Sequence, residues 1–343
     1  MIRRPVDLRS DTVTRPDKGM LQAMISAEVG DDVFEDDPTV KALEARSAKM
    51  LGKESGLFVA SGTMGNQVAL MTHTRPGDEV IVGKPCHILE HEVGAAAVLS
   101  SVTLVCVDAQ HGVLDPAAIE AEIRVEDLHH PETGLLCLEC AHGTGAVQPL
   151  ASLRAASAVA RKHGLPVHLD GARIFNAALV LGCEPRAIAD VADSVMFCLS
   201  KGLGAPVGSV LVGEQDWIRR ARKKRKMLGG GMRQAGYLAA AGLYALEHNI
   251  ERLAEDHART QKMADALRDV PGLSVFAERL DIDMVWFTLR TERPDSEIVD
   301  ALREREVLVY PALGGEWRLV VHKDMDDGDL DYAIAQLKAV LGG

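Results

Sequence analysis

Hydrophobic and polar positions in the middle of the chain switch between two periods. Residues 151–163 carry apolar side chains at helical spacing, and the Gly-Leu-Pro sequence after them ends that helix. Residues 167–169 then predict a short strand that leads into Asp170, and residues 194–199 and 208–213 predict two more buried strands. Strands that alternate with helices in this way predict an α/β fold with a mainly parallel sheet covered by helices on both faces.

The pattern changes toward the end of the chain. Residues 232–269 predict one long helix, which Pro271-Gly272 stops. Further elements are expected at 283–289 (strand), 296–305 (helix), 307–310 (strand), 317–321 (strand) and from about 328 onward (helix). We therefore expect two domains: an N-terminal arm with a large domain over residues 1–250, and a small α+β domain over residues 251–343.

Composition narrows the class of protein. The 343 residues include 38 Lys and Arg against 50 Asp and Glu, a net charge of −12, and only 4% are aromatic. A negative chain with few aromatic rings argues against nucleic-acid binding. Charges interrupt the N-terminus, and no apolar stretch reaches the ~20 residues that span a bilayer. Six cysteines are too few for a disulfide framework. We expect a cytoplasmic protein with reduced thiols that binds neither nucleic acid nor membrane.

Polar residues at predicted strand ends carry the candidate chemistry. The Ser61-Gly62-Thr63 turn leads from a strand into a helix, where backbone N–H groups can bind a phosphate. Asp170 and Lys201 each follow a predicted strand, and open α/β sheets bind ligands at the carboxyl ends of their strands. These groups together indicate a pyridoxal phosphate (PLP) site, because the lysine amine can form a Schiff base and the carboxylate can pair with the pyridine nitrogen.

Other motifs allow different interpretations. The segment from His87 to His91 matches the H-x-x-E-H pattern of zinc peptidases, but no third ligand is evident. Cys137 and Cys140 lack the second pair that a zinc site needs, so we expect no metal ion. Seven of the eight residues 219–226 are basic, which favours a solvated helix face over a nucleic-acid site. The glycines that follow lack the spacing of a dinucleotide-binding turn.

Seven segments spread over nearly the whole chain carry a family resemblance. They are Asp7–Thr14, Glu28–Val33, Ser61–Asn66, His168–Arg173, Cys198–Leu203, Lys226–Gln234 and Arg318–His322. Together they resemble the L-threonine aldolases, which are fold-type-I PLP enzymes related to the β-eliminating lyases. The resemblance implies a large domain with a mostly parallel seven-stranded sheet covered by helices, and a small C-terminal α+β domain.

The resemblance also assigns cofactor-binding residues. It implies that Lys201 binds PLP covalently, that Asp170 pairs with the ring nitrogen and that His87 stacks on the ring face. Arg173 would lie beside the hydroxyl edge of the ring. The phosphate would be bound by Ser61, Gly62 and Thr63 and, from the neighbouring subunit, by Lys226 and Arg233.

The implied substrate is a β-hydroxy-α-amino acid. Arg318 and Ser10, with Arg173 nearby, would bind its carboxylate, since a guanidinium matches a carboxylate bidentately. His129 would lie near the β-hydroxyl group, and His129 or His87 would act as the base. The implied reaction is retro-aldol cleavage of L-threonine or L-allo-threonine to glycine and acetaldehyde. The implied assembly is a homodimer with shared active sites, paired again into a homotetramer.

Two departures from the family pattern leave the substrate open. Phe34-Glu35 stands where the family commonly has Tyr-Gly, which removes a hydroxyl group near the substrate. Cys140-Ala141 stands where Asn-Thr is common, which removes polar groups from a strand end. A phenylserine-preferring aldolase and a PLP-dependent β-eliminating lyase therefore stay as alternatives.

Overall fold

The computed structural model describes residues 4–125 and 127–342, and the chain divides into two compact units. The larger unit comprises Pro16–Gly143 and Val147–Ile250, and the smaller unit comprises the residues up to Arg15, Thr144–Ala146 and the chain from Glu251 onward. The N-terminal arm, which we expected with the large domain, thus groups with the C-terminal part. The physical reason is backbone pairing, because β1 (Val6–Asp7) runs parallel to β12 (Val307–Leu308).

An eight-stranded sheet forms the centre of the larger unit, in the order β2-β9-β8-β7-β6-β3-β4-β5. Its strands are β2 (Ser55–Val59), β3 (Glu79–Lys84), β4 (Thr103–Gln110), β5 (Val113–Leu114), β6 (Thr133–Glu139), β7 (Val167–Asp170), β8 (Ser194–Cys198) and β9 (Ser209–Gly213). The strands from β8 to β4 pair in parallel, whereas β9 is antiparallel to both of its neighbours and β5 is antiparallel to β4. The predicted mainly parallel α/β sheet is confirmed, with the two-residue β5 added to the seven expected strands.

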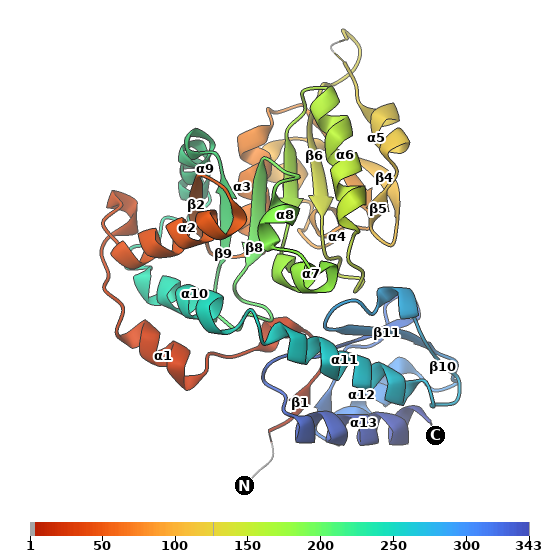
Figure 1. Cartoon of the computed structure of the whole chain (residues 1–343). Coiled ribbons are helices and arrows are strands. Elements are labelled where there is room, and N and C mark those ends of the chain that lie inside the picture. Colours follow the sequence, from red (N-terminus) through yellow and green to blue (C-terminus); the bar gives the residue numbers. More distant parts are fainter. Residues whose placement is uncertain (1–3, 126, 343) are drawn as a thin grey trace. The chain divides into compact units, whose positions relative to one another are not determined.

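Helices of the larger unit cover this sheet (Figure 1). Helix α3 packs against α9, and buried side chains of both meet Leu57, Val59 and Met196 of the sheet. The helices are α1 (Lys18–Ile25), α2 (Pro38–Leu51), α3 (Gly62–His73), α4 (His87–Glu90), α5 (Pro116–Glu122), α6 (Leu150–Lys162), α7 (Ile174–Leu181), α8 (Pro185–Ala189), α9 (Gln215–Met227) and α10 (Gly236–His248), with a 3-10 helix at Asp32–Phe34 and a π-helix at Ala96–Ser100. Within the described chain, every helix is too short or too polar to cross a bilayer.

The long helix expected over residues 232–269 is wrong, because the chain forms two helices there. Helix α10 ends at His248, and α11 (Leu253–Leu267) begins four residues beyond Asn249 in the smaller unit. Asn249 is buried, and its side-chain amide donates a hydrogen bond to the carbonyl oxygen of Leu203. This polar contact coincides with the end of α10, whereas the hydrophobic pattern alone predicts that the helix continues.

The smaller unit is an α+β fold with its own core, as predicted. A three-stranded antiparallel sheet has the order β10-β11-β13, and the rings of Phe287 and Trp317 stack on it with centroids 6.3 Å apart. The strands of this sheet are β10 (Leu273–Val275), β11 (Met284–Leu289) and β13 (Glu316–Val320). The unit also contains α12 (Asp295–Arg303), α13 (Asp327–Leu341) and 3-10 helices at Asp11–Val13 and Ala277–Arg279.

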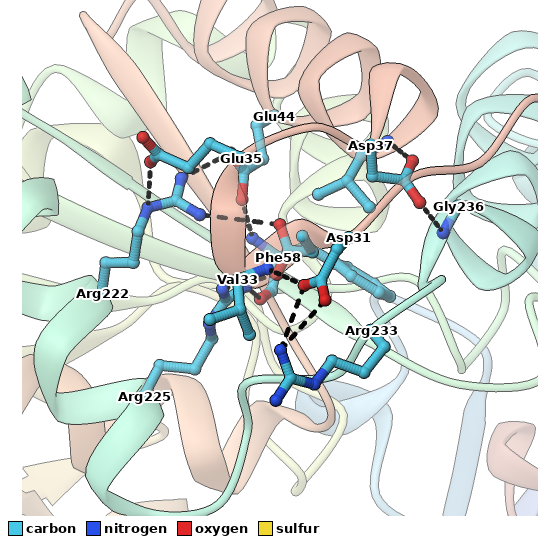
Figure 2. Close-up of polar contacts among 12 residues, drawn as sticks. Asp31, Val33, Glu35, Asp37, Glu44, Phe58, Arg222, Arg225, Arg233 and Gly236 are labelled. Carbon is cyan, nitrogen blue, oxygen red and sulfur yellow. Dashed lines mark hydrogen bonds and ion pairs between the residues drawn. The ribbon is translucent and has the colours of Figure 1, made fainter.

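A charged cluster fixes α9 to the segment before α2 in the larger unit (Figure 2). Arg225 and Asp32 form a buried ion pair, with Nη2 to Oδ2 at 2.6 Å and both side chains at most 4% exposed. Arg225 also donates to the carbonyl oxygen of Phe58 in β2 at 2.7 Å. One turn earlier, Arg222 bonds Glu44 of α2 at 2.7 Å and Glu35 at 3.2 Å. The cluster therefore connects α9, α2 and the edge of the sheet.

Glu35 in this cluster adopts a left-handed backbone conformation with a φ of 60°. Such a φ costs a residue with a side chain roughly 1–2 kcal/mol and suits glycine. Glycine would adopt the backbone conformation of position 35 at lower cost. In this chain, the ion pair with Arg222 offsets part of the cost of that conformation.

We expect Arg225→Met to destabilise the larger unit by up to about 3–5 kcal/mol, because the buried Asp32 carboxylate would keep only its longer contact of 3.7 Å with Arg222. Urea unfolding followed by circular dichroism measures the change. Arg219→Met on the same helix is the matched control, since Arg219 and its partner Asp216 are both about three quarters exposed and such pairs contribute little. Equal destabilisation by the two variants would contradict the prediction.

Candidate active site

Strand β7 brings its two polar side chains to one face of the sheet. Because side chains alternate along a strand, His168 and Asp170 share a face. His168 lies in register with Ser194 of β8, and both residues are fully buried. Asn66 of α3 hydrogen-bonds both His168 and Asp170, so this face of β7 is the one covered by α3.

The Asp170 carboxylate is buried and bound by two N–H donors. Its Oδ2 accepts from Asn66 Nδ2 at 2.7 Å, and its Oδ1 accepts from the backbone N–H of Ala172 at 3.0 Å. Asp170 thus places a hydrogen-bonded carboxylate at the carboxyl end of β7, although it is only 3% exposed.

A second buried carboxylate, Glu92, lies beside Asp170. Glu92 is 1% exposed and accepts hydrogen bonds from Asn66 Nδ2 at 2.8 Å, Gln67 Nε2 at 2.6 Å and His87 Nδ1 at 2.8 Å. Because a carboxylate only accepts, His87 carries its proton on Nδ1 in the neutral form, which leaves Nε2 as an acceptor. The hydrogen bond with Glu92 raises the pKa of His87, while burial opposes the rise.

A tight backbone arrangement places these two residues. His87 begins α4 directly after β3, and its backbone N–H donates to Glu139 at the end of β6 at 3.0 Å. Glu92 follows α4 and precedes Val93, which has a left-handed φ of 56°. A β-branched residue rarely adopts that φ, so the chain reverses under strain immediately after Glu92.

Lys201 and Arg173 lie at the ends of neighbouring strands. Lys201 follows β8, and its positive charge acts to lower the pKa of His87 while the negative charge of Asp170 acts to raise it. The structure thus brings His87, Asp170 and Lys201 into one electrostatic environment. Arg173 caps the start of α7, three residues beyond Asp170, and is half-buried.

The first turn of α3 forms the proposed phosphate-binding end of the site. The Ser61 hydroxyl group caps this helix and accepts from the backbone N–H of Met64 at 3.2 Å, and Gly62 and Thr63 open its first turn. A Cβ on Gly62 would lie 2.9 Å from Cys198 Sγ. Only glycine therefore lets the N-terminus of α3 approach the end of β8, the strand that leads to Lys201.

Lys226 and Arg233 flank the triple-glycine segment after α9 and are exposed. Arg233 pairs with Asp31 of its own chain, with Nη1 to Oδ2 at 3.0 Å (Figure 2). A Cβ on Gly231 would lie 2.7 Å from the Lys226 side chain, so this glycine leaves room for the lysine. Both cations face the surface of the single chain.

His129 lies apart from the other predicted residues of the larger unit. It sits in an exposed loop before β6, where its backbone N–H bonds the Asp127 carboxylate at 2.7 Å. The seven residues of β6, which begins at Thr133, separate it by about 20 Å from the carboxyl edge that holds Glu139. Within one chain, His129 is thus at the opposite edge of the sheet from His87 and Asp170.

Ser10 and Arg318 belong to the smaller unit, where they are neighbours. Ser10 caps the 3-10 helix that starts at Asp11, and its hydroxyl group accepts from the backbone N–H of Thr12. Arg318 of β13 donates from Nη2 to the carbonyl oxygen of Arg9 at 3.4 Å and lies over the ring of Trp286.

The zinc-peptidase pattern does not assemble as a site. Glu90 and His91 are exposed, and the group of metal-type ligands that converges around His87 consists instead of Glu92 and Asp170, with ligand atoms within 4.8 Å of one another. The hydrogen bonds from Asn66 and His87 already engage these carboxylates.

Known proteins are similar to this chain over nearly its whole length. The family model described as beta-eliminating lyase matches residues 7–290. The chain belongs to the beta-eliminating lyase family. Among curated relatives, it is 45% identical to the low specificity L-threonine aldolase of Escherichia coli strain K12, over 98% of this chain and 99% of that protein. It is 41% identical to low-specificity L-threonine aldolase 1 of Arabidopsis thaliana, over 98% and 96% of the two chains.

Solved structures show that this beta-eliminating lyase family member shares its fold with other enzymes. The threonine aldolase of Leishmania major superposes with a TM-score of 0.83 at 19% identity, over 98% of this chain and 100% of that one. The serine palmitoyltransferase of Sphingomonas wittichii superposes with a TM-score of 0.79 at 17% identity, over 98% and 87%. At these identities, the likeness concerns the fold alone.

Several site residues of this lyase family member escaped the sequence interpretation. Glu92, Gln67, His168, Ser194 and His73 were assigned no role, and Asn66 was noted only as part of a motif. The strand pattern could have identified His168, because residues two positions apart on a strand share a face and His168 lies two positions before Asp170. Likewise Asn66 and His73 are two helical turns apart and share a face of α3.

We expect Glu92→Gln to lower the pKa of His87, because the carboxylate that stabilises the charged imidazole is removed. Nuclear magnetic resonance titration of the His87 ring in the full-length protein measures this value. Glu90→Gln is the control, since Glu90 lies two residues away and is exposed. A His87 pKa that is the same in both variants would contradict the pairing.

Proposed function

We propose that this chain is a PLP-dependent aldolase that cleaves L-threonine and L-allo-threonine to glycine and acetaldehyde. The observation that carries the proposal is the convergence of His87, Asp170 and Lys201 in a chain 45% identical to a low specificity L-threonine aldolase over nearly its full length. The same site would serve other β-hydroxy-α-amino acids, since the carbon–carbon bond that breaks is common to them.

The residues of the site fit PLP. Asp170 is a buried, hydrogen-bonded carboxylate suited to a protonated pyridine nitrogen, and Lys201 offers the amine for covalent attachment. The N-terminus of α3, which Gly62 brings close to β8, offers N–H groups and a positive helix end to the phosphate. When bound, PLP supplies an electron sink for the negative charge that develops on the substrate Cα atom.

His87 is suited to hold and move the proton of the β-hydroxyl group. Its Nδ1 donates to Glu92, so its Nε2 lone pair is free to accept a proton directly or through a water. The carboxylate–imidazole pair fixes the tautomer and stabilises the charged ring after proton uptake, as in other enzymes with a carboxylate behind a histidine. The same ring would stack on the cofactor face.

Arg318 and Ser10 would bind the substrate carboxylate. The Arg318 guanidinium is held by the carbonyl oxygen of Arg9 and by the face of Trp286 within the smaller unit. Such a preordered guanidinium loses little freedom when it binds a carboxylate bidentately. A fixed carboxylate orients the Cα–Cβ bond for cleavage, and Arg173 would be a further cation for the ligand.

We also propose a cytoplasmic homodimer with shared active sites, which pairs into a homotetramer. Lys226 and Arg233 are exposed cations that would reach the phosphate of a neighbouring copy. Exposed apolar side chains accompany them, with Phe34 at 72% and Met227 at 69%. His129 can act near the substrate only if another copy supplies it, and the adjacent Leu128 is 94% exposed.

Incubation with L-threonine and, separately, L-allo-threonine tests the reaction. We expect the purified, PLP-loaded protein to release glycine and acetaldehyde in equal amounts, measured by amino-acid analysis and by coupled reduction of the aldehyde. Lys201→Ala should lose both the borohydride-trappable cofactor and this activity. Release of 2-oxobutanoate instead would indicate the β-eliminating alternative, and full activity of Lys201→Ala would contradict the proposal.

Subunit complementation tests the shared sites. Lys201→Ala and Arg233→Ala should each be nearly inactive, the second because the phosphate loses a cation. When the two variants are unfolded together and refolded in equal amounts, hybrid dimers with one intact site should restore about one quarter of the wild-type activity. If Arg233 serves its own chain, no hybrid contains an intact site. Absence of recovered activity would then contradict the shared arrangement.

A further inference from the structure

A buried chain of hydrogen bonds runs from the outer end of α3 to the two carboxylates of the site. We call it the relay, and its members are His73, Ser194, His168 and Asn66. His73 Nε2 lies 2.8 Å from Ser194 Oγ, Ser194 Oγ lies 2.8 Å from His168 Nδ1, and His168 Nε2 lies 3.1 Å from Asn66 Oδ1. Ser194, His168 and Asn66 have no exposed surface.

The orientation of the Asn66 amide is set by the carboxylates. Its Nδ2 atom has two protons, and it lies 2.7 Å from Asp170 Oδ2 and 2.8 Å from Glu92 Oε1. A carboxylate only accepts, so both protons of Nδ2 are used. The Oδ1 atom therefore faces His168, and His168 Nε2 has to carry a hydrogen.

The remaining protons of the relay follow in order. Burial lowers the pKa of His168 to about 4, so its ring is neutral at pH 7 and Nδ1 is an acceptor. Ser194 then donates to His168 Nδ1, and its oxygen accepts from His73 Nε2–H. Burial lowers the pKa of His73 to about 3, so this ring is neutral as well. Every hydrogen in the relay thus points toward Asp170 and Glu92.

We propose that His168 and Ser194 are positioning residues, whose hydrogen bonds hold the Asn66 amide in the orientation that points both of its Nδ2 protons at Asp170 and Glu92. This inference rests on the proposed function in assigning Asp170 to PLP. The two carboxylates accept from the same Nδ2 atom, and this shared donor offsets the repulsion between them. A flipped Asn66 would present oxygen to both. The Nε2–H of His168 opposes that flip, and the Ser194 hydroxyl group satisfies the buried Nδ1 atom of His168 in this tautomer.

The hydrogen positions themselves give the first test. In the full-length PLP-loaded protein with ¹⁵N-labelled histidine, we expect His73 and His168 to be neutral with hydrogen on Nε2, and to stay neutral down to about pH 5.5. Spectra of His73→Gln and His168→Gln identify the two signals. A His168 ring that is charged at pH 7, or that carries hydrogen on Nδ1, would overturn the proposal. This measurement needs no substitution to be tolerated at Ser194.

PLP affinity gives the second test. Ser194→Ala leaves the buried Nδ1 acceptor of His168 without its donor, and we expect it to weaken PLP binding roughly tenfold, measured by equilibrium dialysis. Ser157→Ala is the matched control. Ser157 of α6 is equally buried, but its hydroxyl group donates to the carbonyl oxygen of Val191, which precedes β8. Equal PLP affinity in the two variants would overturn the proposal, whatever their melting temperatures.

Failure of the proposed function is a separate result. A protein with the expected tautomers and the expected loss of PLP affinity, but without cleavage of L-threonine, would support the relay and contradict the aldolase assignment. A protein that cleaves L-threonine but has the Nδ1–H tautomer at His168 would support the aldolase assignment and contradict the relay.

Discussion

The Asn66 amide is the one group on which both carboxylates of the site depend. It bridges Asp170 and Glu92 with its two N–H groups, and Glu92 in turn bonds His87. Such a shared donor offsets the repulsion between two buried carboxylates. Gln67 and His87 also donate to Glu92, and the backbone N–H of Ala172 also donates to Asp170, but Asn66 connects the two carboxylates. One neutral side chain of α3 thus joins the carboxylate assigned to the cofactor nitrogen to the carboxylate that bonds His87.

Much of the larger unit was predictable because its elements alternate. Buried strands such as β7 and β8 are short apolar runs that end in polar residues, and helices such as α6 have an apolar face with helical period. The prediction was wrong where a single polar contact decided the structure. Asn249 ends α10 through a bond to Leu203, a residue 46 positions away, which no local pattern contains.

Long-range pairing also explains the membership of the N-terminal arm. Strand β1 joins the smaller unit through β12, which lies 300 residues later in the chain. A two-residue strand such as β1 has no periodicity of its own. The partner strand therefore determines which unit contains β1. From the sequence alone, the arm is grouped with the residues that follow it in the chain.

The candidate site divides in the same way. Asp170 and Lys201 could be singled out because they follow apolar strands, and His87 because the family resemblance implies it. Glu92 could not, since it follows a four-residue helix and precedes a valine with left-handed backbone, so no period marks it as buried. His129 was also named from the resemblance, but its loop at the amino edge of β6 separates it from the rest of the site in one chain.

The one-way order of hydrogen bonds from His73 to Asn66 has an electrostatic consequence. Each member is a neutral dipole with its positive end nearer the carboxylates, so the dipoles add along the row. Helix α3 contributes a dipole of the same sense, because its N-terminus approaches the end of β8. The net charge of −12 already includes Asp170 and Glu92. In this acidic chain, aligned dipoles of neutral groups thus contribute to the stabilisation of two buried carboxylates.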